Sequence, residues 1–498
     1  MSAVALPVLL AYLALLGALA VFGAHRLRVA RLYRAHRDNP PPRLSPDALP
    51  RITVQLPIFN ERNVVERLID AACALDWPRD RLQVQVLDDS TDDTAELARA
   101  AASRWAARGV TIEVLHRAER RGFKAGALAE GLERATGELI AIFDADFVPA
   151  PDFLRAIVPY FDLGAPRPRI GMVQARWGHL NEGASLLTAL TATLLDGHFI
   201  VEHTARNRAG LFFNFNGTAG VWRAEAIRDG GGWQHDTVTE DLDLSYRAQL
   251  AGWRFVYLRD LVVPSELPGT MRAYKNQQHR WAKGAVQTAR KLLPRILASD
   301  LPRPVKREAL SHLTLNLSYP LVLAVALLLP WTLPARLALH QPWFFALDLA
   351  LFGVTLWSNL RFYGLALREA HPGALAPLLR LPAVLALGIG MAVNQSRAVL
   401  EGLLGRDATF VRTPKEGDGG ARLYAPAASW TAALELGLAL YYGVAIAWAA
   451  SHERWGSVPW MSLFFAGFAY VGLASARRPR PSRRQGPQAI EIVVEAAA

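Results

Sequence analysis

The feature that most constrains this chain is a pair of apolar regions that flank a long charged segment. Residues 3–24 contain no charged side chain, and a run of about 20 apolar residues is enough to cross a bilayer. Uncharged runs return in the C-terminal part, where Leu313–Ala335 and Trp455–Ala476 are the clearest. We therefore expect a multi-pass membrane protein with one large water-exposed domain.

The charges beside the first apolar run predict its orientation. The nearest arginines all lie on its C-terminal side: Arg26, Arg28, Arg31, Arg34 and Arg37. A cleaved signal peptide has its basic residues before the apolar run instead. Basic residues next to a span stay in the cytosol. We therefore interpret residues 1–25 as a transmembrane helix, 26–50 as a basic linker and 51–300 as a cytosolic domain.

Residues 301–476 hold the remaining predicted spans. Besides the two uncharged runs, Leu337–Leu360 carries only Asp348, and Leu436–His452 is shorter but apolar. With the N-terminal helix, these runs predict about five spans.

One apolar stretch, Leu381–Ser396, is short and flanked by arginines, so it either spans the membrane or lies at its surface. If it lies at the surface, the basic loop 401–428 and the basic tail 477–498 both fall in the cytosol, as the charge bias favours. We therefore predict an interfacial helix at about residues 374–400. The end of the tail is polar and is expected to be disordered.

Within the water-exposed domain, apolar runs rich in β-branched residues alternate with helical patterns. The predicted strands are Ile52–Leu56, Gln83–Leu87, Val110–Leu115 and Leu139–Phe143. The predicted helices between them are Asn63–Leu75, Thr94–Ala107 and Ala125–Ala135. This alternation predicts an α/β domain with a parallel sheet and right-handed crossovers. Ligands of such sheets bind beyond the carboxyl ends of the strands.

Acidic residues follow two of these strands, as Asp88-Asp89 and as Asp144-Ala145-Asp146. A divalent cation held by carboxylates neutralises the charge of a leaving diphosphate, which is the leaving group of a nucleotide sugar. Asp-x-Asp alone is weak evidence, because such pairs are more often turn formers or helix caps. Its position after a buried strand favours a metal site at Asp144 and Asp146, for Mg²⁺ or Mn²⁺.

Four further residues are candidates for nucleotide-sugar binding. Asp89 is placed to accept hydrogen bonds from a ribose or base, or to cap the following helix. Phe59, with Glu61 beside it, follows the first strand and either stacks on a base or belongs to the core. Lys124 precedes a helix and either reaches the phosphates or lies in solvent.

Two downstream motifs are suited to the transfer itself. In Thr239-Glu240-Asp241, Asp241 is the candidate general base, and Glu240 is either a second catalytic residue or a capping or ion-pair residue. Thr239 is the expected N-cap of the next helix. The segment from Gln277 to Trp281 supplies, with Arg280, an amide, a cation and an aromatic face for an acceptor sugar or the leaving group, although Trp is also a common membrane anchor.

In their order along the chain, these motifs resemble those of family 2 glycosyltransferases of the cellulose synthase superfamily, including the cellulose-synthase-like mannan and glucan synthases. The likeness extends over about Arg51–Leu293. The segments that carry it are Val54–Glu61, Gln85–Asp92, Phe215–Arg223, Ser265–Pro268 and Gln277–Trp281.

The resemblance implies a nucleotide-diphosphosugar transferase domain of the GT-A type and a membrane channel for the product. It implies metal at Asp144 and Asp146, nucleotide contacts from Phe59, Asp89 and Lys124, a base at Asp241, and a Gln-x-x-Arg-Trp element of Gln277, Arg280 and Trp281. Inversion at an α-linked donor would give a β-linkage. Phe410, Thr413 and Lys415 match the cytosolic gating loop of cellulose synthases, although Arg412 stands where that loop has valine.

Two enzyme functions stay open at this stage. The first is processive polysaccharide synthesis from UDP-glucose or GDP-mannose, and the second is transfer of one sugar to a membrane lipid. A transporter or receptor with a regulatory nucleotide-binding domain is a third possibility. Nucleic acid is not an expected partner, because the basic runs behind the net charge of +11 flank apolar spans.

The single cysteine, Cys73, excludes an intrachain disulfide and is expected in the core. The oligomeric state leaves no trace in the sequence.

Overall fold

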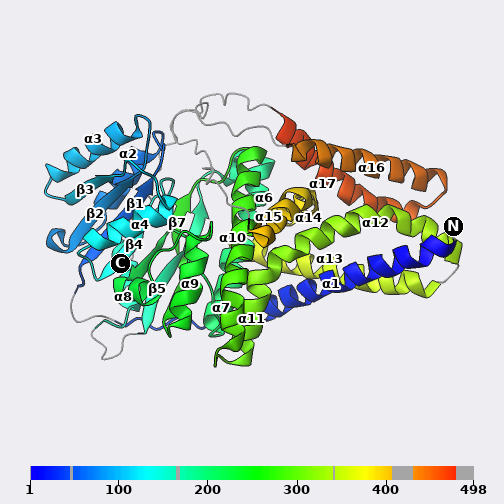
Figure 1. Ribbon diagram of the computed structural model, residues 1–498, viewed down its shortest axis with the longest axis horizontal. Helices are drawn as coiled ribbons and strands as arrows, with labels where there is room; N and C mark the ends of the chain where they lie inside the picture. The colour runs from blue at the N-terminus through cyan, green and yellow to red at the C-terminus, as the bar shows by residue number, and fades with distance from the viewer. Residues whose placement is uncertain (1, 45–48, 164–168, 340–341, 406–429, 478–498) are drawn as a thin grey trace.

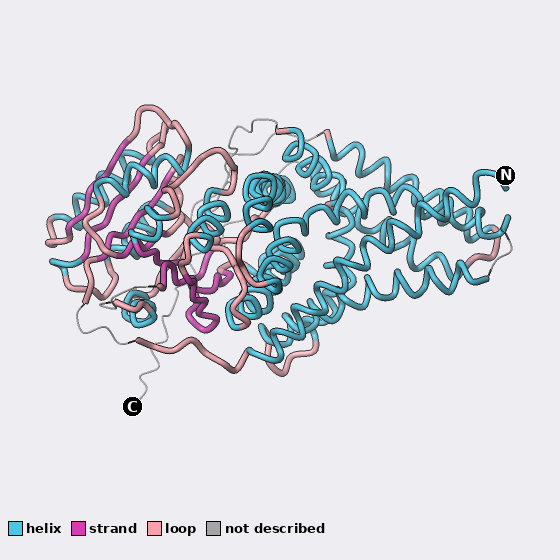
Figure 2. The backbone as a smooth tube through the Cα atoms, turned by 60° about the horizontal axis from the view of Figure 1, so that its bottom comes forward, coloured by secondary structure: helices cyan, strands magenta, loops and turns pink. Residues whose placement is uncertain are grey.

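The computed structural model describes residues 2–44, 49–163, 169–339, 342–405 and 430–477. An α/β domain lies at one end and a bundle of long helices at the other (Figure 1). Figure 2 shows the same division from another side, with all the strands in one half of the molecule.

The described strands form one mixed sheet in the order β3-β2-β1-β4-β6-β5-β7. Their bounds are β1 Ile52–Ile58, β2 Leu82–Asp88, β3 Thr111–His116, β4 Leu139–Ile142, β5 Ile170–His179, β6 Gly220–Arg223 and β7 Arg254–Ser265. β1 to β4 pair in parallel, which confirms the predicted α/β arrangement. β6 is antiparallel to both β4 and β5, while β5 and β7 are parallel.

The helices of this domain connect and cover the strands. They are α2 Val65–Cys73, α3 Thr94–Ala106, α4 Phe123–Arg134, α5 Phe153–Ile157, α8 Ala224–Asp229 and α9 Glu240–Leu250. The central strands β1 and β4 are buried along nearly their whole length, so both faces of the sheet contribute to one apolar core. Cys73 is buried in that core, as predicted.

The bundle contains seven long helices of the described chain: α1 Ser2–His36, α12 Ser318–Leu339, α13 Pro342–Ala370, α14 Leu381–Gly390, α15 Ala392–Leu404, α16 Thr431–Ser451 and α17 Val458–Ala476. Among the described residues, four helical segments are long and apolar enough to cross a membrane: Val4–His36, Arg303–Leu339, Thr431–Ser451 and Trp455–Ala476.

Three details of the bundle differ from the sequence expectations. α1 continues to His36, so the first part of the expected linker is helical. The predicted span Leu337–Leu360 is divided, because α12 ends at Leu339 and α13 begins at Pro342. The predicted interfacial helix is a pair, α14 and α15, bent by 45°, and this pair is either a broken span or a re-entrant segment.

Helices also lie between the sheet and the bundle, among them α6, α7, α10 and α11 (Figure 1). Their bounds, with those of the π-helix η4, are α6 Leu186–Asp196, η4 Gly197–His203, α7 Thr204–Arg208, α10 Met271–Ala298 and α11 Arg303–Thr314. α10 packs against α9 of the α/β domain on one side and α15 of the bundle on the other. These helices therefore connect the sheet directly with the helix bundle.

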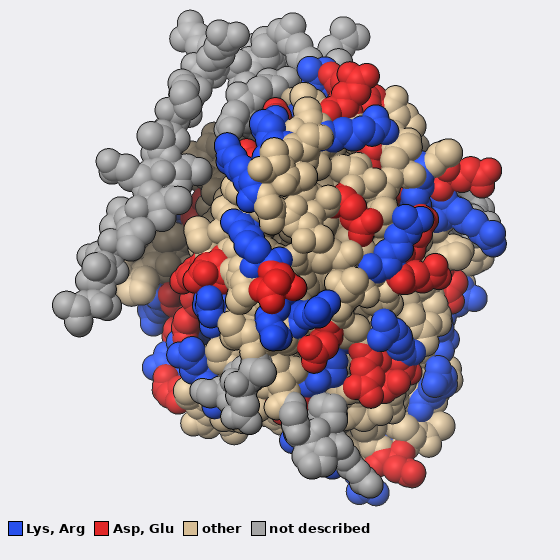
Figure 3. Space-filling model, turned by 90° about the vertical axis from the view of Figure 1, so that its left-hand side faces the viewer, with Lys and Arg blue, Asp and Glu red and all other residues tan. Residues whose placement is uncertain are grey.

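On the face of the α/β domain that points away from the bundle, Lys and Arg lie interspersed with Asp and Glu (Figure 3). A nucleic-acid surface instead gathers basic residues on one face. The described part of this face shows both signs of charge side by side.

Candidate active site

One cavity, of about 190 Å³, lies beyond the carboxyl ends of β1, β2 and β4. It is lined by all the predicted site residues that the structure describes: Phe59, Glu61, Asp89, Lys124, Asp144, Asp146, Glu240, Asp241, Gln277, Arg280 and Trp281. The sequence motifs that contribute them are far apart along the chain, so the fold is what brings them together. The predicted gating residues Phe410, Thr413 and Lys415 lie outside the described residues.

Asp144 and Lys124 meet in the middle of the cavity. Asp144 follows β4, and its backbone N–H donates to Thr218 Oγ1 at 2.8 Å. Lys124, in the first turn of α4, donates to Asp144 Oδ1 at 2.5 Å and to the Gly217 carbonyl at 2.8 Å. Its side chain is only 18% exposed, so it is not a solvated surface lysine. Asp146 Oδ2 accepts from the backbone N–H of Glu266 at 3.2 Å.

Glu240 and Asp241 occupy the first turn of α9, across the cavity from β4. Because Gly217 has no side chain, Asp241 and Lys124 can both lie close to its backbone. A Cβ at Gly217 would lie 3.0 Å from Asp241 Oδ2 and 3.3 Å from Lys124 Nζ, and its φ of +84° is one that other residues rarely adopt. Thr239 holds the expected N-cap position of α9, but its side chain makes no capping hydrogen bond.

The acidic side chains that line the cavity outnumber the basic ones. Burial, together with the Glu240 carboxylate, raises the pKa of Asp241 to about 7. Burial also raises the pKa of Glu240, against the opposing effect of Lys124. For Lys124, burial would lower the pKa, but Asp144 and Glu240 outweigh burial and raise it. The cluster is therefore suited to a cation, which would relieve this repulsion.

Arginines from the loop after β3 cover the residues predicted to hold the nucleotide. The guanidinium carbon of Arg120 lies 3.4 Å from the centre of the Phe59 ring. Arg117 donates to both carboxylate oxygens of Asp89, at 2.7 and 2.6 Å. Asp89 therefore pairs with Arg117 instead of capping α3. A base that stacks on Phe59 must displace or join the Arg120 side chain.

The side of the cavity formed by α10 and β5 is aromatic. The ring centres of Trp281, on α10, and Trp177, on β5, lie 6.4 Å apart. Trp177 also packs against Phe147 and Phe199, with ring centres 5.1 and 4.9 Å away. Sequence reasoning did not identify Trp177, because nothing around it marks a motif. Asn216, Glu266 and Arg120 also line the cavity, and of these Asn216 and Glu266 lie in segments that carry the family resemblance.

Close packing between α10 and α9 sets the position of Asp241. A Cβ at Gly284 of α10 would collide with the side chain of Thr239, directly before Glu240. We expect Gly284→Ala to displace the start of α9, at a cost of about 1–3 kcal/mol in stability, and to lower the transfer rate. Gly388→Ala, at a helical glycine of α14 with nothing within 4 Å, is the matched control and should leave both unchanged. Thermal unfolding and initial rates of both variants test this, and equal behaviour would contradict it.

The residues present fit a divalent cation that is shared with a substrate. The described residues contain no group of three or more His, Cys, Asp or Glu side chains arranged around a metal. Asp144 and Asp146 line the cavity together, however, and Mg²⁺ is usually held by one or two carboxylates together with substrate phosphates and water. A diphosphate entering this acidic cavity needs such a cation to offset charge repulsion.

The mixed sheet with an acidic cavity at its carboxyl edge is the arrangement of the GT-A fold. Residues 50–284 match the family model described as "Glycosyltransferase like family 2". The probable glucomannan 4-beta-mannosyltransferase 2 of Oryza sativa subsp. japonica is 37% identical over 426 residues, which are 81% of this chain and 69% of the relative. The chain belongs to glycosyltransferase family 2, as the resemblance in the sequence indicated.

Two further comparisons also find mannosyltransferases. Glucomannan 4-beta-mannosyltransferase 2 of Arabidopsis thaliana is 45% identical over 296 residues, 56% of this chain and 55% of the relative. The chain thus matches little more than half the length of several curated relatives. The mannosyltransferase PcManGT from Pyrobaculum calidifontis, solved with GDP-Man and Mn²⁺, is 25% identical with a TM-score of 0.53, and the match covers 80% of this chain and all of that one.

Proposed function

We propose that this enzyme transfers hexosyl units from a nucleotide sugar to a growing β-linked polysaccharide, with GDP-mannose as the favoured donor and UDP-glucose as the alternative. The observation that carries the proposal is the single cavity in which the donor, base and acceptor candidates meet. The names of the relatives, which are glucomannan mannosyltransferases, support the polymer product. The GDP-Man in the solved mannosyltransferase supports the donor.

In the proposed reaction, Asp241 is the general base. Its carboxylate takes the proton of the acceptor hydroxyl, whose oxygen forms a bond to the anomeric carbon of the donor. The bond from that carbon to the diphosphate oxygen breaks, and the nucleoside diphosphate leaves with the electron pair. Attack from the side opposite the leaving group converts an α-linked donor into a β-linked product. Asp241 lies beside Glu240 and Gly217 on the wall of the cavity, where an acceptor hydroxyl could reach it.

The other lining residues hold the two substrates. Asp144 and Asp146 would bind Mg²⁺ or Mn²⁺, which when present neutralises the leaving diphosphate. Lys124 and Arg280 reach the same cavity and are suited to phosphate oxygens. Trp281 and Trp177 offer apolar ring faces to the acceptor sugar. Phe59 and Arg120 would enclose the base. Asp89 and Glu61 would lie at the nucleotide end of the cavity.

The charges beside the helix bundle favour one orientation of the protein in the membrane. The arginines at the end of α1 favour a cytosolic position for the α/β domain. A product released beside α10 then leaves between the bundle helices, to the other side of the membrane. The segment with Phe410, Thr413 and Lys415 is outside the described residues, and its proposed gating role rests on the resemblance of its motif alone.

The test begins with donor screening of the purified full chain. GDP-mannose, UDP-glucose and related donors are supplied singly, and release of nucleoside diphosphate is measured. The product is then separated by extraction with organic solvent and by digestion with β-mannanase or β-glucanase. A polymer that these enzymes digest supports the proposal. A lipid-soluble product with one sugar would instead establish the glycolipid alternative.

Metal removal is expected to stop transfer reversibly. A chelator should abolish release of nucleoside diphosphate, and added Mg²⁺ or Mn²⁺ should restore it. Asp144→Asn and Asp146→Asn should each raise the metal concentration needed by about 10- to 100-fold or more, since even loss of a group that supports a metal ligand has that effect. Asp152→Asn, an exposed carboxylate shortly after this motif, is the control. Full activity in the presence of the chelator would refute a metal at this site.

A further inference from the structure

Two histidines, His198 and His203, lie five residues apart in the segment between α6 and α7. In an α-helix, which has about 3.6 residues per turn, side chains five positions apart point about 140° away from each other. This segment is instead the π-helix η4, in which hydrogen bonds join residues five apart, so both histidines lie on one face. Their ring centres are 4.2 Å apart. The π-helix therefore brings the two imidazole rings together.

The side-chain amide of Asn216 contacts both rings. Its Oδ1 lies 2.6 Å from His203 Nε2, and its Nδ2 lies 2.9 Å from His198 Nε2. An amide oxygen only accepts and an amide nitrogen only donates, so His203 donates through Nε2 and His198 accepts at Nε2. His198 then carries its proton on Nδ1, which lies 3.2 Å from Glu202 Oε2 and donates to it. The two histidines therefore hold opposite tautomers.

Burial of His203 disfavours the reverse orientation of this amide. That orientation would require His203 to carry its proton on Nδ1, but Nδ1 is buried and has no hydrogen-bond partner among the described residues. A buried N–H without a partner is costly, because it has lost its contact with water and gained nothing in return. Burial, with His198 and Arg206 nearby, also lowers the pKa of His203 well below its ordinary value, so the ring stays neutral.

The contacts with the histidines use the oxygen and one N–H of the Asn216 amide. Among the described residues, no hydrogen bond occupies its second N–H. Asn216 is only half-buried and lines the cavity of the candidate active site. The next residue, Gly217, lies directly against Asp241 and Lys124. One hydrogen-bond donor of fixed direction is thus left beside the candidate base.

Contacts of η4 and of the Asn216 backbone place this donor near the aromatic side of the cavity. The ring of Phe199 lies 5.0 Å from the ring of His198 and 4.9 Å from that of Trp177, measured between ring centres. The backbone N–H of Asn216 donates to Gln174 Oε1 at 3.1 Å, on the strand that carries Trp177. The amide therefore lies between the candidate base and the ring faces suited to an acceptor sugar.

We propose that His198 and His203 are positioning residues, whose opposite tautomers hold the Asn216 amide so that its free N–H donates to an oxygen of the acceptor sugar beside Asp241. The inference rests on the proposed function for the identity of the acceptor. Without either histidine the amide can rotate and present its oxygen instead. The acceptor hydroxyl is then poorly placed for transfer of its proton to Asp241, whereas the nucleotide contacts are unchanged.

Paired substitutions separate the hydrogen bonds from the packing of the rings. His198→Phe and His203→Phe keep an aromatic ring and remove the contact with Asn216. Each should lower kcat/KM for the acceptor by about tenfold, the usual effect of one lost hydrogen bond, with KM for the donor within twofold. His198→Gln and His203→Gln supply an amide oxygen or N–H near the lost Nε2 and should restore most of the activity. His312→Phe removes a histidine that bonds Tyr246 instead and is the matched control.

A double-variant cycle shows whether the histidines act through Asn216. Asn216→Ala should cause a similar loss, and adding His203→Phe to it should cause no further loss, because the group that His203 holds is already absent. The full chain is assayed in detergent with the donor that screening identifies and with mannohexaose or cellohexaose as the acceptor.

An Asn216→Ala chain with native acceptor kinetics would overturn the inference, even where a histidine variant does not fold. Additive losses in the double variant, or Phe variants that match His312→Phe, would also overturn it. If the native chain releases no nucleoside diphosphate from any donor, the proposed function fails instead.

Discussion

Replacing Asp241 by Asn is expected to lower the rate of sugar transfer by about 10²- to 10⁴-fold, the usual contribution of a general base. Asn keeps the size and shape of Asp and still accepts the hydrogen bond that Leu242 N–H donates to Oδ1 at 2.8 Å. It cannot take the proton of the acceptor hydroxyl. The substitution also removes a buried charge beside Glu240, so we do not expect a loss of stability.

The matched control is Asp236→Asn, which changes the charge equally on the loop before α9. Asp236 is 57% exposed and pairs with Lys291 at 2.8 Å outside the cavity, so its replacement should leave the rate within about twofold. Initial rates at saturating donor and donor binding by calorimetry are measured on both. If Asp241→Asn transfers sugar at the rate of Asp236→Asn, Asp241 is not the base. If the Asp241→Asn variant binds no donor, the role of Asp241 is in donor binding.

The first half of the α/β domain was predictable because its physical signals are local. β1 to β4 and α2 to α4 begin and end within a few residues of the predicted bounds. The parallel strands are buried on both faces and so appear as short apolar runs, and each intervening helix shows its own periodicity. The carboxyl ends of β1, β2 and β4 then fix where Phe59, Asp89 and Asp144 must lie.

The second half depends on contacts that no local pattern contains. β6 pairs antiparallel to β4, which is far from it in the sequence, and the segment before β6 places Gly217 beside Lys124. The approach of α9 to this loop depends on Gly217 and Gly284, whose importance appears only when the neighbouring atoms are known. The covering of Phe59 by Arg120 is likewise a tertiary contact. The resemblance of the motifs indicated which residues belong together, but not how they meet.

The membrane region shows the same limit. Hydropathy located the apolar segments, yet it could not place the break between α12 and α13 or the bend between α14 and α15, because these depend on packing among the helices. Nor did it indicate that α1 continues past the apolar run. That extension brings His25 and Arg28 of α1 to α11, where they contact a buried carboxylate.

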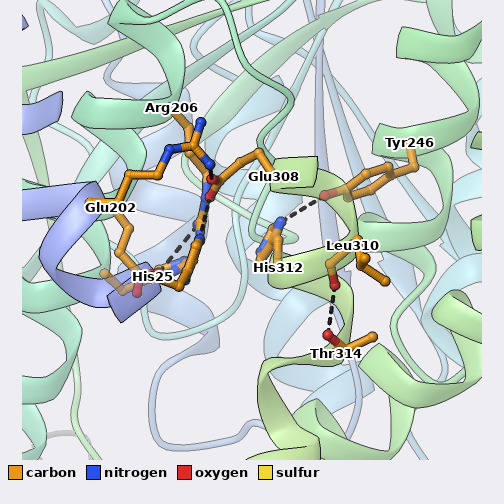
Figure 4. A network of polar contacts seen from close by, with 10 residues as sticks. His25, Glu202, Arg206, Tyr246, Glu308, Leu310, His312 and Thr314 are labelled. Atoms are coloured by element: carbon orange, nitrogen blue, oxygen red, sulfur yellow. Dashed lines mark hydrogen bonds and ion pairs between the residues drawn. The ribbon is translucent and has the colours of Figure 1, made fainter. Parts of the chain in front are cut away.

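This carboxylate, Glu308, is the centre of a polar network between the membrane helices and the α/β domain (Figure 4). Glu308 is fully buried and lies 3.0 Å from both His25 Nε2 and Arg206 Nε. Arg206, also fully buried, donates to Glu202 at 3.2 Å.

The network continues to the candidate active site through η4. Glu202 Oε2 lies 3.2 Å from His198 Nδ1, and His198 Nε2 lies 2.9 Å from Asn216 Nδ2. His203 Nε2 also lies 2.6 Å from Asn216 Oδ1. Asn216 lines the cavity. A continuous series of polar contacts thus joins α1 and α11 to the active-site wall.

Glu308→Ala is therefore expected to destabilise the protein by about 3–5 kcal/mol, because removing one partner of a buried ion pair leaves the other buried charge poorly compensated. Arg206 would keep only Glu202, and Glu202 also contacts His198. The matched control is Glu66→Ala, which removes the same charge from an ion pair with Arg104 whose side chains are 46% and 49% exposed. That pair should contribute only about 0–1 kcal/mol. Thermal unfolding of both variants in the same detergent compares the two losses. Equal unfolding temperatures would mean that the network does not stabilise the contact between the helix bundle and the α/β domain.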